Sequence, residues 1–215
     1  MRIGIVGGTF DPFHRGHLDP VLAAREQLQW DRVLYIPAWR QPFKTDRDTA
    51  PGYHRFAMTA LAIRDYDALY ASPIELERGG ISYTVDTLEE LHRDYAGASF
   101  DWIIGDDNLA DLDRWKDSER LYKLARFVVL TRQGVGSGEW GVGVEAPNTT
   151  ASSPTPHPPL PTPRPTILFA RNATVPVSST EIRRRVRAGE PIDAFVDPLV
   201  SRYIHHYGLY KEGQH

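Results

Sequence analysis

The sequence contains no cysteine, which excludes disulfide bonds and zinc sites built from thiolates. Its eight histidines leave metal binding and acid–base chemistry open. Long apolar runs are also lacking, since none approaches the roughly 20 residues that span a bilayer. The chain passes from Arg2 directly into IGIVGG, without the hydrophobic region of a signal peptide. We therefore expect a cytoplasmic protein with no membrane partner.

A strong net charge is lacking as well. The formal net charge is −3 and the pI is near 6.2, which gives no electrostatic reason to expect a nucleic-acid partner. At 215 residues the chain can bury one core of ordinary size. We predict a single domain over residues 1–215, whose substrates have to be inferred from local motifs.

Short apolar runs separated by amphipathic stretches dominate the chain. Residues 17–29, 53–66 and 84–95 carry apolar side chains three and four positions apart, as helices that cover a sheet do. The apolar runs suit buried parallel strands and lie at residues 3–6, 33–36, 102–104, 127–130 and 167–169. This alternation predicts an α/β fold with a mainly parallel sheet, in which ligands bind at the carboxyl ends of the strands.

Residues 133–165 break this pattern, because they are rich first in glycine and then in proline. A connection of this length without helical or strand periodicity is unusual inside a domain, and is typical of an insertion or a functional lid. We favour a solvated, flexible insertion, because few of these residues could offset the entropy cost of ordering by burial.

Two common nucleotide-binding motifs are defined by short sequence patterns. GxxxxGK[ST] is absent, which argues against a P-loop nucleotide hydrolase. A GxGxxG motif occurs at Gly136, Gly138 and Gly141, but the sequence that follows it, VGVEAPNTTASSP, has no helical pattern. We interpret this match as chance within a glycine-rich loop.

A better candidate for phosphate binding is GIVGGTFDPFHRGHL, residues 4–18. Gly7 and Gly8 follow a predicted strand and allow the backbone to approach an anion closely. Thr9 and Phe10 can then offer main-chain N–H groups to that anion.

Two histidines close this stretch, at the predicted start of a helix. His14 and His17 flank Gly16 and lie three positions apart, so that they share one face of the helix. Both imidazoles could donate hydrogen bonds to a phosphoryl oxygen beside the helix N-terminus. A lone histidine here would more simply cap the helix or pack in the core, but the pair after GGTFDP favours a functional role.

The residues GGTFDPFHRGH, together with SSTEIRRRV far along the chain, resemble the HxGH nucleotidyltransferase superfamily. Within it, the segments SYTVDTL, IIGDDNL and RWKD are similar to those of the bacterial nicotinate-nucleotide adenylyltransferases. The matching segments span nearly the whole chain except the segment rich in glycine and proline. The resemblance implies a Rossmann-like, doubly wound sheet with helices on both faces and a small C-terminal helical portion.

The resemblance also implies an activity in NAD biosynthesis. AMP is transferred from ATP to the 5′-phosphate of nicotinate mononucleotide, which gives nicotinate adenine dinucleotide (deamido-NAD) and pyrophosphate. ATP and the mononucleotide are the expected small-molecule partners. Mg²⁺ is the expected cofactor and would be held through ATP phosphates and water, with no protein metal ligands.

Roles for individual residues follow from the matched motifs. The catalytic residues implied are His14, His17 and Arg183. The nucleotide-binding residues implied are Gly7, Gly8, Thr9, Phe10, Lys44, Gly105, Asp107, Ser178, Ser179 and Thr180. The residues implied for the mononucleotide are Tyr83, Thr84, Trp115 and Arg132. Simpler roles compete at several positions, because serine, threonine and aspartate often only cap helices and Trp115 could be a core residue.

The chain departs from the family pattern at QPFK, where many members read PPHK and Phe43 therefore replaces a histidine. This leaves open whether the acid or the amide form of the mononucleotide is the preferred acceptor. A non-catalytic nucleotide-sensing module on the same fold is the alternative from another class, and the retained His14, His17 and Arg183 argue against it. Whether the chain forms a homo-oligomer also stays open.

Overall fold

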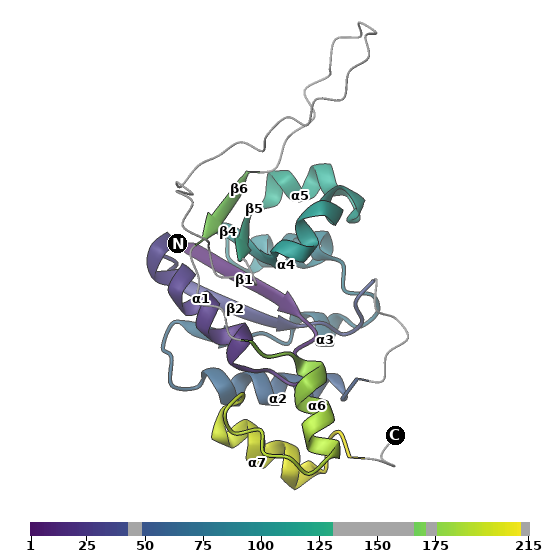
Figure 1. The fold of residues 1–215 in the computed structure, drawn as a ribbon. Helices are drawn as coiled ribbons and strands as arrows, with labels where there is room; N and C mark the ends of the chain where they lie inside the picture. Colours follow the sequence, from purple (N-terminus) through teal and green to yellow (C-terminus); the bar gives the residue numbers. More distant parts are fainter. Residues whose placement is uncertain (43–48, 131–165, 171–175, 212–215) are drawn as a thin grey trace, which may run out of the picture.

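The computed structural model describes residues 1–42, 49–130, 166–170 and 176–211 (Figure 1). The predicted insertion at 133–165 lies outside these residues. The strands are β1 (Arg2–Gly8), β2 (Arg32–Pro37), β3 (Leu69–Ala71), β4 (Ser99–Gly105), β5 (Arg126–Leu130) and β6 (Ile167–Ala170). The helices are α1 (Arg15–Leu28), α2 (Gly52–Ile63), α3 (Ile74–Arg78), α4 (Thr84–Asp94), the 3-10 helix η1 (Asp106–Arg114), α5 (Ser118–Leu124), α6 (Ser179–Arg187) and α7 (Pro198–Tyr207).

All six described strands form one parallel sheet in the order β3-β2-β1-β4-β5-β6. The chain runs outward from β1 through β2 to β3, and then outward from β4 through β5 to β6 on the other side. This confirms the predicted α/β class and the doubly wound sheet. The strand order reverses between β1 and β4, and ligands bind beyond the carboxyl ends of strands at such a switch point. Gly8 and Gly105 end these two strands.

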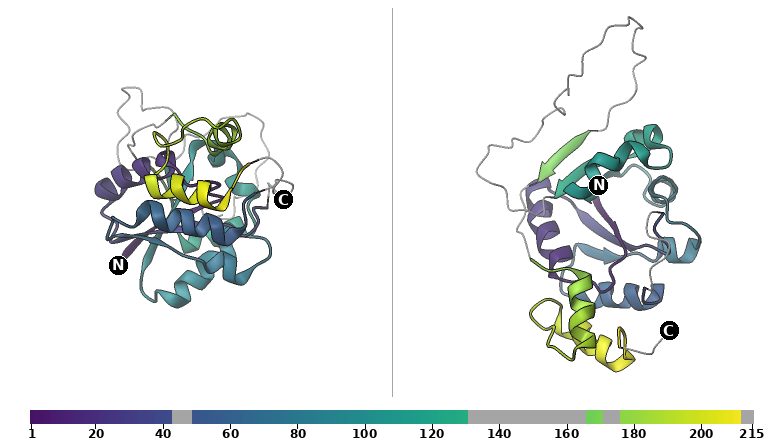
Figure 2. Two further views of the ribbon diagram at one scale, coloured as in Figure 1. Left: turned by 90° about the horizontal axis from the view of Figure 1, so that it is seen from below. Right: turned by 45° about the vertical axis from the view of Figure 1, so that its right-hand side comes forward.

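Helices cover both faces of the sheet, as predicted. Alternate residues of β2 separate into two cores, with Val33 and Tyr35 in one and Leu34 and Ile36 in the other. Helices α1, α2, α6 and α7 contribute to the first core, and α4 and α5 to the second. Figures 1 and 2 show α4 and α5 on one side of the sheet, with the α6–α7 pair on the other beside α2.

A polar cluster lies near the amino ends of the strands and is centred on Asp101, which is fully buried. Its Oδ2 accepts a hydrogen bond from the indole Nε1 of Trp30 at 2.6 Å. Arg126 donates from Nε to Oδ1 and from Nη2 to Oδ2, both at 2.7 Å, and Arg2 adds an ion pair at 3.3 Å. Both carboxylate oxygens are therefore bonded, and the cluster ties β1, β4 and β5 together.

The five strands predicted from the sequence are all present, and the structure adds β3. This edge strand has only three residues, and its Tyr70 is 42% exposed, so that it is too short for a detectable run or periodicity. Helices α3 and α5, with five and seven residues, and the 3-10 helix η1 were likewise not predicted. No helix in the described part of the chain is long and apolar enough to cross a membrane.

Candidate functional site

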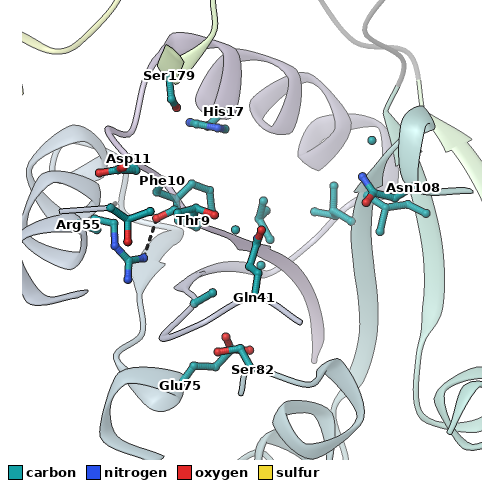
Figure 3. Close-up of a pocket in the computed structure, with 18 of the residues that line it drawn as sticks. Thr9, Phe10, Asp11, His17, Gln41, Arg55, Glu75, Ser82, Asn108 and Ser179 are labelled. Atoms are coloured by element: carbon teal, nitrogen blue, oxygen red, sulfur yellow. Dashed lines mark hydrogen bonds between the residues drawn. The ribbon is translucent and has the colours of Figure 1, made fainter. Parts of the chain in front are cut away.

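A large cavity of about 1440 Å³ lies beyond the carboxyl ends of β1 and β4. In Figure 3, His17 and Ser179 lie on one side of it, and Glu75 and Ser82 on the opposite side. The predicted site residues that line it are Gly7, Gly8, Thr9, Phe10, His14, His17, Tyr83, Thr84, Gly105, Asp107, Trp115, Ser178, Ser179, Thr180 and Arg183. Lys44 and Arg132, like Phe43, lie outside the described residues.

The wall nearest β1 is the turn Thr9–Pro12, whose carbonyl groups are held by side chains from distant elements. Arg55 of α2 donates from Nη1 to the carbonyl oxygen of Thr9 at 2.8 Å, which Figure 3 shows as a dashed line. Arg183 of α6 donates from Nη1 to the carbonyl of Asp11 at 2.6 Å, and Ser179 donates from Oγ to that of Pro12 at 3.1 Å. Two helices therefore fix the shape of this turn through its oxygens.

The amide groups of the same turn remain available to a ligand. Among the described residues, no hydrogen bond is donated by the amide of Thr9 or Phe10, and both residues line the cavity. Phe10 has a φ of 51°, in the left-handed region, and successive amides in such a turn form a concavity that binds anions. The turn thus suits a phosphate group, as predicted.

Glycine at position 7 is required by packing. A Cβ atom on Gly7 would lie 2.8 Å from Cζ2 of Trp102 on the neighbouring strand β4. The indole therefore sits directly against the backbone where β1 enters the turn. Gly7 shapes the cavity floor by allowing this approach, so its glycine is explained without a ligand contact.

The two predicted histidines are brought together at the start of α1. Their rings stack with centroids 3.7 Å apart, and the backbone N–H of His14 donates to Nδ1 of His17 at 3.3 Å. Because Nδ1 of His17 accepts this bond, its neutral ring carries the proton on Nε2, which is then a donor. The tyrosine hydroxyl of Tyr35 donates to the carbonyl of His17 at 3.1 Å and holds this turn of the helix.

The N-terminus of α6 faces the same cavity. Ser178 is its N-cap and accepts a hydrogen bond at Oγ from the amide of Glu181 at 3.2 Å. Ser178 therefore has the capping role that competed with ligand binding, whereas the hydroxyl of Ser179 reaches the turn at Pro12. Arg183 follows one turn later, and only 18% of its side chain is exposed. A helix N-terminus and a guanidinium group thus converge beside the two histidines, which suits a polyphosphate.

Asp11 was not predicted as a site residue, although it lies within the motif. It is 3% exposed, and its Oδ1 accepts hydrogen bonds from the hydroxyl of Tyr210 at 2.6 Å and the amide of Ala50 at 3.2 Å. Its Oδ2 lies 3.7 Å from Nη1 of Arg183. Burial raises the pKa of the Asp11 carboxyl, although Tyr210 and Arg183 both oppose that rise. The sequence could have pointed to Asp11, because this residue lies within the GGTFDP motif.

Arg55 and Tyr210 were not predicted as site residues. Arg55 lies on the amphipathic helix α2 but is only 2% exposed, and burial lowers the pKa of its guanidinium group. Tyr210 follows α7, and burial together with the neighbouring Asp11 raises the pKa of its phenol. Both residues reach the turn across the core, which the sequence alone could not show.

The opposite side of the cavity holds three of the residues predicted for the mononucleotide, Tyr83, Thr84 and Trp115. The ammonium group of Lys116 lies 4.6 Å from the centre of the Tyr83 ring and 3.0 Å from Oδ1 of Asp86. These contacts connect α4 to the segment that carries Trp115. Trp115 packs edge-on against Phe127 at 6.3 Å, yet also lines the cavity, so one ring serves both core and site.

The buried carboxyl group of Glu75 lies on the same side of the cavity. Glu75 is 4% exposed, and its Oε1 accepts a hydrogen bond from the hydroxyl of Thr87 at 2.6 Å. Burial raises the pKa of Glu75. Ser82 Oγ in turn accepts a bond from the amide of Trp39 at 3.0 Å, which joins the strand end of β2 to the segment before α4.

The third side of the cavity lies at the end of β4. A Cβ atom on Gly105 would lie 2.6 Å from Oδ1 of Asp107, so the glycine lets the Asp107 carboxylate fold back over the strand end. The side-chain Nδ2 of Asn108 donates a hydrogen bond to the same oxygen at 2.9 Å. Asp107 is exposed at the cavity margin, where a carboxylate can accept hydrogen bonds from a ligand hydroxyl.

Acidic and imidazole side chains are spread around the cavity. The described residues contain no group of three or more His, Cys, Asp or Glu side chains that could hold a metal ion. The acidic residue within the turn, Asp11, already accepts a hydrogen bond from Tyr210 and lies 3.7 Å from Nη1 of Arg183.

Comparison with known proteins agrees with this geometry. Residues 5–185 match the family model described as cytidylyltransferase-like. A Gemmatimonas aurantiaca protein named "Probable nicotinate-nucleotide adenylyltransferase" is 38% identical over 213 residues, which cover 99% of this chain and 93% of that protein. A Thermus thermophilus protein of the same name is 38% identical over 211 residues, covering 98% and 100%.

Solved structures show the same fold. The nicotinic acid mononucleotide adenylyltransferase of Plasmodium falciparum complexed with NaAD superposes with a TM-score of 0.69 at 19% identity, and the match covers 97% of both chains. The same enzyme complexed with APC gives a TM-score of 0.67 at 18% identity, covering 97% of this chain and 96% of the other. The chain belongs to the cytidylyltransferase-like family and, within it, to the nicotinate-nucleotide adenylyltransferases.

Proposed function

We propose that the cavity binds ATP and nicotinate mononucleotide and transfers AMP from one to the other. The observation that carries this proposal is the convergence of two stacked imidazoles, the Thr9–Phe10 amides and Arg183 on one wall. Each of these groups donates hydrogen bonds or carries positive charge, and together they suit a triphosphate. The relatives named above are nicotinate-nucleotide adenylyltransferases, which supports the choice of acceptor.

In the proposed reaction, a 5′-phosphate oxygen of the mononucleotide attacks the α-phosphorus of ATP. The bond between the α-phosphorus and the bridging oxygen breaks, and pyrophosphate leaves with the electron pair. The protein then has two tasks, which are to hold two anions in line and to stabilise the charge that develops. Nε2–H of His17 and the guanidinium group of Arg183 are the donors placed for the second task.

The acceptor is proposed to lie on the opposite side, against Tyr83, Thr84 and Trp115. An indole that is partly exposed to a cavity can stack on a pyridine ring. Mg²⁺ is proposed to arrive with ATP and to neutralise phosphate charge, while the chain's own residues hold the phosphates. Chelation of Mg²⁺ should therefore stop turnover without unfolding the protein, which circular dichroism would check.

The test is an assay with ATP, Mg²⁺ and either mononucleotide, in which pyrophosphate and dinucleotide are both quantified. We expect product with nicotinate mononucleotide at higher kcat/KM than with nicotinamide mononucleotide. Absence of product with both acceptors would overturn the transfer function, whereas preference for the amide would overturn only the acceptor.

Two neighbouring arginines on α6 give a matched pair for this assay. Arg183 reaches the turn, whereas Arg184 forms ion pairs with Glu181 at 2.9 Å and Glu190 at 2.7 Å. We expect Arg183→Ala to lower kcat/KM for ATP by about a hundredfold, because a charged donor to the phosphates is lost. Arg184→Ala should leave it nearly unchanged. Equal effects of the two substitutions would contradict the role given to Arg183.

A further inference from the structure

Tyr210 reaches the site from a part of the chain that neither motif includes. It follows the C-cap of α7, Gly208, and its own φ of 66° lies in the left-handed region that few tyrosines adopt. Its hydroxyl nevertheless donates a 2.6 Å hydrogen bond to Oδ1 of Asp11, 199 positions earlier. A backbone conformation of this kind persists only where surrounding contacts favour it.

The bond from Tyr210 ends on a carboxylate that is itself connected to the phosphate-binding groups. Asp11 receives Nη1 of Arg183 at its backbone carbonyl, at 2.6 Å, and the same nitrogen lies 3.7 Å from its Oδ2. Arg183 therefore contacts both the main chain and the side chain of Asp11. Any rotation of the Asp11 carboxylate changes the electrostatic environment of this guanidinium group.

Few other groups could hold the Asp11 carboxylate in place. Among the described residues, its Oδ2 accepts no hydrogen bond, and its Oδ1 has only the amide of Ala50, at 3.2 Å, besides Tyr210. The Tyr210 bond is the shorter of the two. Its loss would leave a buried carboxylate with one long hydrogen bond, next to the residue that the triphosphate needs.

We propose that Tyr210 is a positioning residue for the transfer reaction, and this inference rests on the proposed function. Tyr210 is not among the described residues that line the cavity, so its proposed effect on the substrates is indirect, through Asp11. By fixing the Asp11 carboxylate, it keeps the Thr9–Pro12 turn and Arg183 in the arrangement that binds the triphosphate. The residues that follow α7 therefore support the ATP side of the cavity and not the mononucleotide side.

Tyr210→Phe tests this inference, because it removes only the hydroxyl. Tyr203→Phe is the matched control, since Tyr203 also packs against the same core and its hydroxyl lies 2.9 Å from Nδ1 of His54, away from the turn. We expect Tyr210→Phe to lower kcat/KM for ATP by about tenfold to a hundredfold, the range for a hydrogen bond to a charged group. The KM for the mononucleotide should not change.

A second measurement separates positioning from simple loss of stability. Both variants are assayed well below their thermal midpoints, and binding of a non-hydrolysable ATP analogue is measured by calorimetry. We expect weaker analogue binding for Tyr210→Phe only, even if both variants melt at a lower temperature than the wild type.

Unchanged kcat/KM for ATP in folded Tyr210→Phe would overturn the inference, as would an equal loss in Tyr203→Phe. A rise in KM for both substrates would also overturn it, because the effect would then not be confined to the ATP side. If the wild type itself forms no dinucleotide, the proposed function fails instead. The two failures are distinguishable, because only the second involves the unsubstituted protein.

Discussion

Asp101 and Asp11 are both almost completely buried, but they lie at opposite ends of the strands. Asp101 lies toward the amino ends, where Arg126 and the indole of Trp30 bond both of its oxygens at 2.6 to 2.7 Å. Asp11 lies beyond the carboxyl ends, and only its Oδ1 accepts hydrogen bonds from described residues. The same side chain is thus fully bonded in one place and partly bonded in the other.

The difference shows how the two ends of the sheet divide stability and activity. A buried charge is costly unless it is paired and hydrogen-bonded, so the Asp101 cluster is suited to stabilising the sheet. Burial raises the pKa of Asp11, which means that the fold tolerates this carboxylate at some cost. Such costs are concentrated where residues serve binding or catalysis. The following substitutions test this division.

The largest effect is expected for His17→Ala, at the carboxyl end. It removes a proposed phosphate donor, so we expect kcat to fall by about a hundredfold to a thousandfold. Folding should be nearly intact, because the side chain lines the cavity and is only partly buried, although its 3.3 Å bond at the helix start and its stacking on His14 are lost. Steady-state kinetics and thermal unfolding measure the two effects, and wild-type turnover in this variant would reject the role of His17.

Asp101→Asn should have the opposite pattern. It leaves the guanidinium groups of Arg2 and Arg126 without their carboxylate, and we expect the free energy of unfolding to fall by about 2 to 3 kcal/mol. This value is at the low end for a buried pair, because both arginine side chains are about one-third exposed. Denaturant titration gives the loss. A large fall in kcat/KM at a temperature where the variant is folded would contradict the division.

Asp11→Asn should reduce activity more than stability. The oxygen of the new amide group can still accept the hydrogen bond from Tyr210. Its uncharged NH₂ group then replaces a carboxylate oxygen beside Nη1 of Arg183. We expect kcat/KM for ATP to fall about tenfold to thirtyfold, while the free energy of unfolding changes by less than about 1 kcal/mol because a buried charge is also removed. A stability loss as large as that of Asp101→Asn, with unchanged kinetics, would show that the two aspartates serve the same purpose.

The smallest effect is expected for Glu181→Gln on the exposed face of α6. Ion pairs with Arg184 and Arg185 lower the pKa of Glu181 from 4.5 to about 2. Folding therefore favours its ionised form, and this contribution is complete above pH 4.5 and is lost as the pH falls toward 2. We expect the thermal midpoint to fall by about 1 to 2 °C at pH 7.

The difference between Glu181→Gln and the wild type should shrink between pH 4.5 and pH 3, as calorimetry would show. A difference that is constant with pH would mean that the ion pairs contribute nothing. Activity should not change in either case, since the ion-paired guanidinium groups are not those that line the cavity.

Local sequence was sufficient for five of the six described strands and for one wall of the site. A strand, a glycine turn and a helix start are adjacent in GIVGGTFDPFHRGHL, so that the approach of His14 to His17 could be predicted from spacing. The fold class and the family inferred from the motifs are confirmed. The three-residue strand β3 was missed, because a short edge strand has no periodicity to detect.

The supporting residues could not be predicted in the same way. Arg55 and Tyr210 act on the turn from helices α2 and α7 or their ends, and the neighbouring residues in the sequence do not show which distant segment each side chain reaches. Their roles depend on packing between distant segments. Lys44 and Arg132 stay predictions, because they lie outside the described residues.

The contacts that complete the turn join residues very far apart in the chain. Ser179 and Pro12 are separated by 167 positions, Arg183 and Asp11 by 172, and Tyr210 and Asp11 by 199. Closing such long loops costs chain entropy before any contact compensates for it, so we expect these pairs to form late in folding. A nucleotide that binds only the completed turn should stabilise the native state over partly folded ones, and its binding should report whether these distant segments have come together.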